Sequence, residues 1–127
     1  MKLRLDKHSL RLRVKKSDLQ LLREQNSVSE IIPFPGGAFE YRLETSESLN
    51  EITAKISERS IAVTVPATIA TSWMDNDEVG IYYTLAIGTE SFLDIIIEKD
   101  FPCKSRAEDN IDDSFGELAE KNSSTNC

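Results

Sequence analysis

The feature that most constrains this fold is a pattern of apolar residues that repeats after 51 positions. A shift of 51 aligns residues 2–37 with residues 53–88 without a gap, and it places Leu12 on Val63, for example. Two extra residues in the second copy then extend the match through the next strand of each copy. Few aligned residues are identical, so the repeat is one of pattern. We interpret it as an internal duplication of one supersecondary unit.

The first copy predicts two hairpins on either side of a helix. Alternation of apolar and polar residues with a period of two is typical of half-buried strands. The four expected strands span residues 2–5, 10–15, 28–34 and 39–43. The polar residues 6–9 make the first turn, and the breaker cluster Pro33–Gly37 makes the second.

The helix between these hairpins has a recognisable start. Ser17 and Gln20 fit a capping box, in which the Ser17 hydroxyl accepts from a backbone amide and Gln20 reaches back. We expect the helix to end near Asn26. In the second copy a helix follows Pro66, a residue that suits a first helical turn. The strands of the second copy are expected near residues 54–56, 61–65, 79–87 and 92–98.

Two ββαββ units predict an α+β fold. Each unit is expected to form its own sheet with one apolar face, and the two faces bury each other around a pseudo-two-fold axis. The result is either a two-sheet sandwich or a closed, barrel-like sheet. We expect one domain at residues 1–103, made of pseudo-repeats 1–50 and 51–103, and then an acidic, partly disordered tail at residues 104–127.

Some of the tail is expected to have structure. Ser114–Glu120 predicts one short helix, and the apolar residues Ile111, Phe115 and Leu118 could pack back on the domain. The acidic run at residues 108–113 lacks the spacing and the glycine of an EF-hand loop, so a solvated tail is favoured over a calcium site.

Composition excludes several classes of function. The formal net charge is −7, which disfavours nucleic acid and anionic membranes as partners. No apolar run approaches the ~20 residues that span a bilayer. The first residues alternate charge with leucine, unlike a signal peptide, so we expect a cytoplasmic protein.

Cysteine and histidine are too few for most catalytic or metal chemistry. The sequence has only two cysteines and one histidine, which are Cys103, Cys127 and His8. A structural zinc site needs about four such ligands. A Ser-His-Asp set would have to use His8, which lies in an expected turn. We therefore expect no metal, no cofactor and no catalytic set.

The strongest candidate site is a row of basic residues on the first hairpin. These residues share one sheet face opposite the leucines, and they are Lys2, Arg4, Arg11, Arg13 and Lys15. We call this set the basic face. One interpretation is a surface for a small anionic ligand or phosphate. The alternative, which we favour, is that these basic side chains are ordinary solvent-exposed positions of the strands. Their charges would then pair with acidic side chains on neighbouring strands. No aromatic residue is interleaved in this hairpin, so base stacking has no platform there.

Cys103 is a second candidate, as a reactive thiol. It follows the last expected strand, and Lys104 and Arg106 nearby could lower the pKa of its thiol. Because no base or second thiol is close in sequence, we favour a structural cysteine.

Three groups of residues resemble a known family. They are Met1–Arg13 with Lys16–Asp18, Ile61–Ala67 with Trp73 and Val79, and Ile97–Cys103 with Arg106 and Glu108–Asp109. Together they resemble a family of small uncharacterised bacterial proteins, the domain of unknown function numbered 7009. The resemblance implies a single-domain cytoplasmic protein and supplies no activity, cofactor or catalytic residue. Phe115–Glu117 departs from the Phe-Pro-Asn-Pro type of ending in relatives, so any role of that ending is not carried over.

These observations favour a non-enzymatic binding module over an enzyme. Its expected partner is another protein or a second copy of the chain, engaged through a groove or a sheet edge. The alternative is a protein that binds a small molecule or anion on the basic face.

Overall fold

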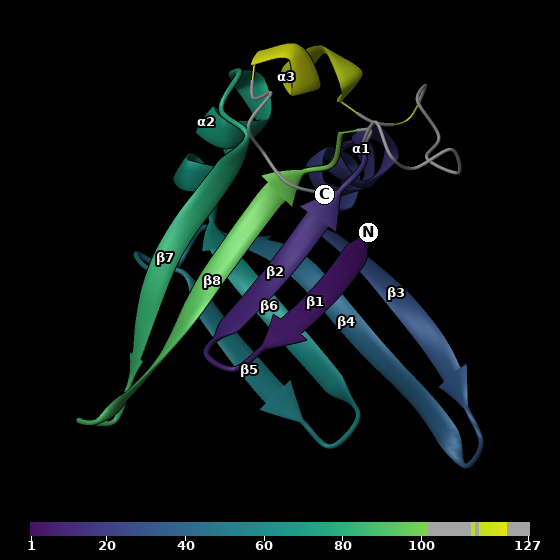
Figure 1. Ribbon diagram of the computed structural model, residues 1–127, viewed down its shortest axis with the longest axis vertical. Coiled ribbons are helices and arrows are strands. Elements are labelled where there is room, and N and C mark those ends of the chain that lie inside the picture. Colours follow the sequence, from purple (N-terminus) through teal and green to yellow (C-terminus); the bar gives the residue numbers. More distant parts are fainter. Residues whose placement is uncertain (102–112, 114, 122–127) are drawn as a thin grey trace.

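A computed structural model describes residues 1–101, 113 and 115–121 (Figure 1). Over these residues the strands are β1 (Lys2–Asp6), β2 (Ser9–Val14), β3 (Ser27–Phe34), β4 (Gly37–Ser46), β5 (Thr53–Ser57), β6 (Ser60–Pro66), β7 (Gly80–Ile87) and β8 (Ser91–Lys99). The helices are α1 (Lys16–Gln25), α2 (Ala67–Asp75) and α3 (Gly116–Lys121). The predicted order of strands and helices is confirmed in both halves of the chain.

The strands form two four-stranded sheets, with the orders β1-β2-β8-β7 and β3-β4-β6-β5. The fold is therefore mixed α+β. The expectation that each ββαββ unit forms its own sheet is wrong, because each sheet takes one hairpin from each half. The central pairs β2–β8 and β4–β6 are parallel, whereas every hairpin is antiparallel.

The helices explain why the hairpins are exchanged. α1 begins directly after β2 and contacts β3 and β4, so it takes the chain from one sheet to the other. α2 follows β6 of the second sheet and leads back to β7 of the first. Each hairpin thus gains a parallel neighbour from another hairpin at the middle of a sheet.

One apolar core joins the inner faces of both sheets and the helices. In β2 the residues Leu10, Leu12 and Val14 are buried, as the alternation predicts. Leu43 and Val63 provide equally buried side chains from the second sheet, and they belong to the same cluster.

The start of α1 differs from the prediction. Lys15, not Ser17, is the N-cap residue, and its backbone N–H donates to Asp18 Oδ2 at 2.8 Å. The side chain of Asp18, at the third helical position, therefore accepts from the backbone amide of the cap residue, the role predicted for Gln20. The helix does end as predicted, because Asn26 has a φ of 61°, a left-handed conformation that asparagine tolerates well.

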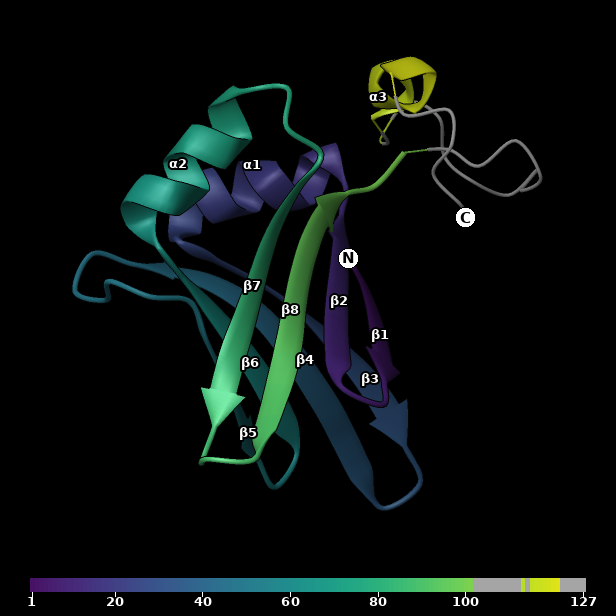
Figure 2. The ribbon, with the colours of Figure 1, turned by 60° about the vertical axis from the view of Figure 1, so that its left-hand side comes forward.

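The helices and the hairpin turns lie at opposite ends of the molecule. Figure 2 shows α1 and α2 together at one end, and the four hairpin turns at the other. The two sheets run between these ends. We refer below to the helix end and the hairpin end.

The C-terminal segment returns to the helix end. The predicted short helix is confirmed as α3, and Leu118 within it is buried. Phe115 packs against the core, as the sequence also suggested. Ile111, Cys103 and Cys127 lie outside the described residues, as does most of the stretch predicted to be disordered.

Candidate functional site

The structure brings four residues of the basic face together on the outside of the first sheet. The register places Lys2 opposite Arg13 and Arg4 opposite Arg11. These side chains point away from the core because Leu10 and Leu12, which alternate with them, point into it. They therefore do not line a tunnel between the sheets. Lys15 is separate from them, at the start of α1.

Acidic residues of β8 and its end lie against this face. Arg11 Nε is 3.0 Å from Glu98 Oε1, and Lys2 Nζ is 3.3 Å from Asp100 Oδ2. Both carboxylates are buried. Part of the positive charge is thus neutralised by neighbouring strands, which is the alternative that the sequence favoured.

Tyr82 is a member of this face that sequence reasoning missed. Pairing across the sheet puts Arg4, Arg11, Ile96 and Tyr82 in one row on its outer side. Burial and the Glu98 carboxylate raise the pKa of Tyr82, while Arg11 lowers it. The row joins a hairpin of the first half to one of the second, so only the sheet order could reveal an aromatic residue on the same face as these arginines, with Ile96 between them.

A second cluster of ionisable groups lies between β1 and the second sheet. The amino group of Met1 is 3.0 Å from Asp18 Oδ2 and 3.1 Å from Glu30 Oε1. The Tyr41 hydroxyl donates to the Met1 carbonyl oxygen at 2.7 Å. Burial, with the carboxylates of Glu30 and Asp18, raises the pKa of Tyr41. These contacts tie β1 to α1, β3 and β4.

The hairpin end carries an apolar surface. Five large side chains there are exposed although their register turns them toward the space between the sheets. They are Leu5 (56% exposed), Ile32 (39%), Phe34 (57%), Ile56 (79%) and Ile87 (50%), and we call them the hairpin-end surface. They come from β1, β3, β5 and β7, which are the four edge strands. Both sheets therefore contribute to it.

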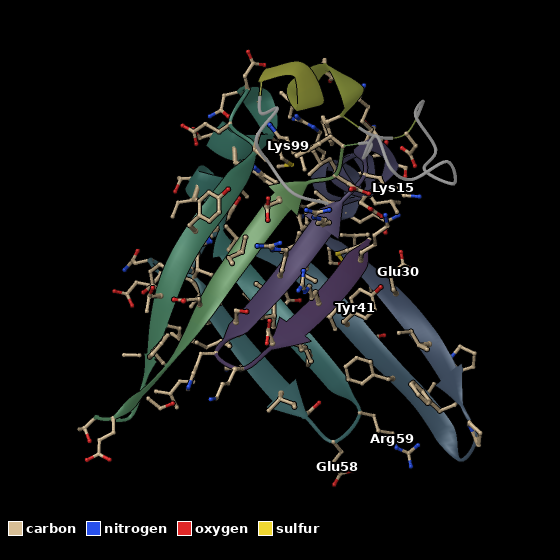
Figure 3. All side chains as sticks on the ribbon, viewed as in Figure 1. Lys15, Glu30, Tyr41, Glu58, Arg59 and Lys99 are labelled. Carbon is tan, nitrogen blue, oxygen red and sulfur yellow. The ribbon has the colours of Figure 1, made fainter. Side chains whose placement is uncertain are left out.

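The turns around this surface carry charges of both signs. They hold the acids Asp6, Glu58 and Glu90 and the bases Lys7 and Arg59. Figure 3 shows Glu58 and Arg59 side by side at the β5–β6 turn, and the guanidinium of Arg59 lies close to Gly37 at the start of β4. The rim of the hairpin-end surface is thus close to neutral.

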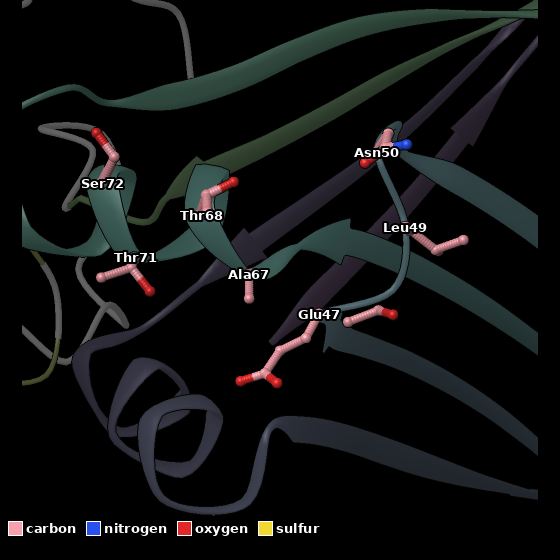
Figure 4. A pocket seen from close by; sticks show the side chains of 8 residues that line it. Glu47, Leu49, Asn50, Ala67, Thr68, Thr71 and Ser72 are labelled. Carbon is pink, nitrogen blue, oxygen red and sulfur yellow. The ribbon is translucent and has the colours of Figure 1, made fainter.

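Two open grooves flank α2. One, of about 680 Å³, lies between this helix and the β4–β5 loop, and its lining includes hydroxyl groups and the Glu47 carboxylate (Figure 4). The other, of about 430 Å³, is lined in part by Trp73 and Tyr82. Neither groove is lined by a lysine or arginine, so neither suits an anion.

The remaining candidates are placed as follows. His8 is an exposed turn residue, as expected, and its ring stacks on Phe92 at 4.8 Å. Cys103 lies outside the described residues, so its role stays a prediction. Among the described residues, no three His, Cys, Asp or Glu side chains gather as ligands for a metal ion. None of the described helices is long and apolar enough to cross a membrane.

The fold defines a class: a mixed α+β protein with two four-stranded sheets and few helices. Residues 1–117 match the model of a family of unknown function, DUF7009, and the chain belongs to that family. The resemblance drawn from its motifs is thus confirmed. No curated protein and no solved structure matches the chain. Membership supplies no activity, so a function has to be inferred from geometry.

Proposed function

We propose that this protein is a non-enzymatic binding module that associates with a second copy of itself through the hairpin-end surface. The observation that carries the proposal is the exposure of five inward-turned apolar side chains on all four edge strands. The proposal keeps the sequence-based expectation that the protein works in the bacterial cytoplasm.

The module is, in this proposal, a two-sheet sandwich of duplicated ββαββ units. Sheet topology supports it. The shift of 51 relates β1 to β5, β2 to β6, β3 to β7 and β4 to β8. Applied to the order β1-β2-β8-β7, this relation produces β5-β6-β4-β3, which is the order of the other sheet. A pseudo-two-fold axis between the two sheets would relate their strands in this way.

Exposed apolar groups of this kind favour association. A large side chain gains about 1.5–3 kcal/mol when it is fully buried, and contiguous exposed patches on small proteins often mark interfaces. The edge strands next to these side chains also present unpaired backbone groups. Association would cover both features at once.

A second copy suits the charges on the rim. In a two-fold dimer the same patch meets itself, so each group needs a complement within the patch. The neighbouring Glu58 and Arg59 provide such a pair, because each could face its opposite on the other copy. A near-neutral rim also limits repulsion between two chains that each carry a net charge of −7.

The test is light scattering after size-exclusion chromatography over a range of concentrations. We expect a dimer for the wild type and a monomer for Phe34→Ser combined with Ile56→Ser. The matched control is Ile31→Ser, because Ile31 is also exposed on β3 but points to the opposite face. A wild type that stays monomeric at about 1 mM, the dissociation constant of a very weak complex, would contradict the proposal. Equal behaviour of the two variants would do the same.

The outer row of Arg4, Arg11 and Tyr82 supports a second candidate, which is binding of a small anion on the basic face. Two guanidinium groups beside a phenol can bind a phosphate or carboxylate. A thermal-shift screen with phosphate, nucleotides and carboxylates tests it. Binding should raise the melting temperature of the wild type but not of the Arg11→Ala, Arg13→Ala variant. If no anion changes the melting temperature of the wild type, anion binding on the basic face is contradicted.

A further inference from the structure

The C-terminal segment contacts the body of the protein through three side chains that resemble a bound peptide. The first is Asp113, which lies at the N-terminus of α1. Its Oδ1 accepts from the Ser17 backbone N–H at 2.9 Å, and its Oδ2 accepts from the Ser17 hydroxyl at 2.7 Å. Carboxylates bind well at this position because the first helical amides have no partner within the helix. The Ser17 hydroxyl accordingly lowers the pKa of Asp113.

The second is Phe115, whose ring covers a buried lysine. Lys99 Nζ lies 5.8 Å from the centre of the Phe115 ring and 5.6 Å from the centre of the Trp73 ring. The same ammonium donates to the Asn76 carbonyl oxygen at 2.6 Å. Lys99 is 2% exposed, and burial lowers its pKa. Figure 3 shows Lys99 near the helix end, beneath α3. Two aromatic faces thus compensate a buried cation.

The third is Leu118, which is buried. The segment also makes a backbone hydrogen bond and an ion pair with the body. The Phe115 N–H donates to the Asp100 carbonyl oxygen at 2.6 Å, and Lys16 Nζ lies 3.5 Å from Glu117 Oε1. The segment therefore combines a carboxylate and an aromatic ring that each contact the body with an aliphatic side chain that is buried.

We propose that the surface formed by Ser17, Lys99 and Trp73 is a recognition site for an acidic–aromatic peptide of the pattern Asp-x-Phe-x-x-Leu. The chain's own residues 113–118 occupy it as a tethered ligand. The site is at the helix end, so it is independent of the association proposed for the hairpin end.

Two observations favour a tethered ligand over an ordinary part of the core. The Asp113 and Glu117 contacts are made by exposed surface side chains, as in the polar rim of an interface. The segment also follows β8 only after residues 102–112, a stretch rich in charged and polar residues. Because the segment belongs to the same chain as the site, its effective concentration there is high, so even a weak peptide stays bound. The family match reaches residue 117 and so includes Asp113 and Phe115.

The experiment supplies the peptide in trans. In the full chain, Asp113→Asn combined with Phe115→Ala vacates the site without touching the body. A labelled peptide with the sequence of residues 113–121 is then titrated into this variant and into the wild type, and binding is followed by fluorescence anisotropy. Trp73 is the single tryptophan, so its emission reports occupancy without a label.

We expect the peptide to bind the vacated variant at least about tenfold more tightly than the wild type, because the wild-type site is already filled by its own segment. A peptide with the same two substitutions should not bind. The control variant Glu90→Gln, which changes an exposed residue in the β7–β8 turn at the opposite end of the molecule, should exclude the peptide as the wild type does.

The proposal is overturned if the vacated variant keeps wild-type circular dichroism and yet does not bind the peptide. It is also overturned if wild type and variant bind the peptide equally. If the vacated variant does not fold, Ser17→Ala provides the second test. This variant should admit the peptide in trans more readily than the wild type, and an unchanged affinity would count against the site.

Discussion

The helix end and the hairpin end of this molecule are made of the same strands and yet differ in burial. Near the helices, inward side chains such as Leu12 and Val63 are buried. At the hairpin turns, inward side chains such as Leu5 and Ile56 are exposed. The alternation of residues is the same at both ends. One difference is the cover, because α1 and α2 lie at one end only (Figure 2). The other is strand position, because Leu10 and Ile61 lie on central strands at the same hairpin end and are buried, whereas the residues paired with them on the edge strands are exposed.

This comparison shows that an inward register does not by itself bury a side chain. A sheet has to be covered by a second layer. At the helix end the second layer includes helices and the C-terminal segment, and at the hairpin end the described residues leave the inward side chains of the edge strands uncovered. Each of the following predictions tests a part of this difference, and they are ordered by expected effect.

The largest effect is expected for Leu12→Ala compared with Leu5→Ala. Both residues lie on inward faces of the β1–β2 hairpin. Truncation of buried Leu12 should reduce the free energy of unfolding by about 2–5 kcal/mol. Truncation of exposed Leu5 should cost less than about 1 kcal/mol. Urea unfolding followed by circular dichroism measures both, and equal losses would mean that the hairpin end is also packed.

On the outside of the first sheet, Arg11→Ala should destabilise the protein by about 1–3 kcal/mol. The change leaves the buried Glu98 carboxylate without its partner at 3.0 Å. The expected loss is smaller than for a fully buried pair because a third of the Arg11 side chain is exposed. Arg4→Ala, on the edge strand, is the control and should stay within about 0.5 kcal/mol. If Arg4→Ala reduced the free energy of unfolding more than Arg11→Ala, the role given to the ion pair between Arg11 and Glu98 would be contradicted.

Ser17→Ala and Asp113→Asn should be coupled. Ser17→Ala removes the hydroxyl that donates to Asp113, and Asp113→Asn removes the charge that strengthens this bond, so their combined effect should be smaller than the sum. We expect a coupling on the order of 1 kcal/mol, since the contact is exposed. A double-mutant cycle of unfolding free energies measures it, and strict additivity would show that the segment is not held there.

The smallest effect is a pH dependence. The pKa of Asp113 is lowered below its ordinary value of 3.8, first by the Ser17 hydroxyl. A carboxylate with a lowered pKa stabilises the docked state above pH 3.8, and this contribution is lost as the pH falls through the lowered pKa. Trp73 emission in the wild type should therefore change over this window by more than in Asp113→Asn. Identical acid profiles would contradict the prediction.

Much of the fold could be predicted from the sequence, because period and turn chemistry are local. The strands, the two helices of the repeat and the end at Asn26 all follow from nearby residues. The start of α1 was mispredicted, since Ser17 and Asp18 both suit a cap. Asp18 bonds the Lys15 amide, and the Ser17 hydroxyl is bound by Asp113, which is 96 residues away.

The candidate site was predictable only in part. The sequence predicted that five basic residues share a face, and the hairpin register, which is local, brings four of them together. It did not place Tyr82 in the same row as Arg11, since that row depends on the parallel pairing of β2 with β8. It did not identify the hairpin-end surface either, because period-two alternation is the same for a covered and an uncovered strand.

The sequence by itself determined the strands, their inward faces, the repeated order of elements and the absence of a rich supply of catalytic side chains. These depend on neighbours a few residues apart. Only the tertiary structure decided which hairpins share a sheet, where the helices provide cover and which apolar residues stay exposed. The physical reason is that burial depends on the layer that arrives from elsewhere in the chain. In this protein α1 and α2 take the chain from one sheet to the other and provide that layer at one end.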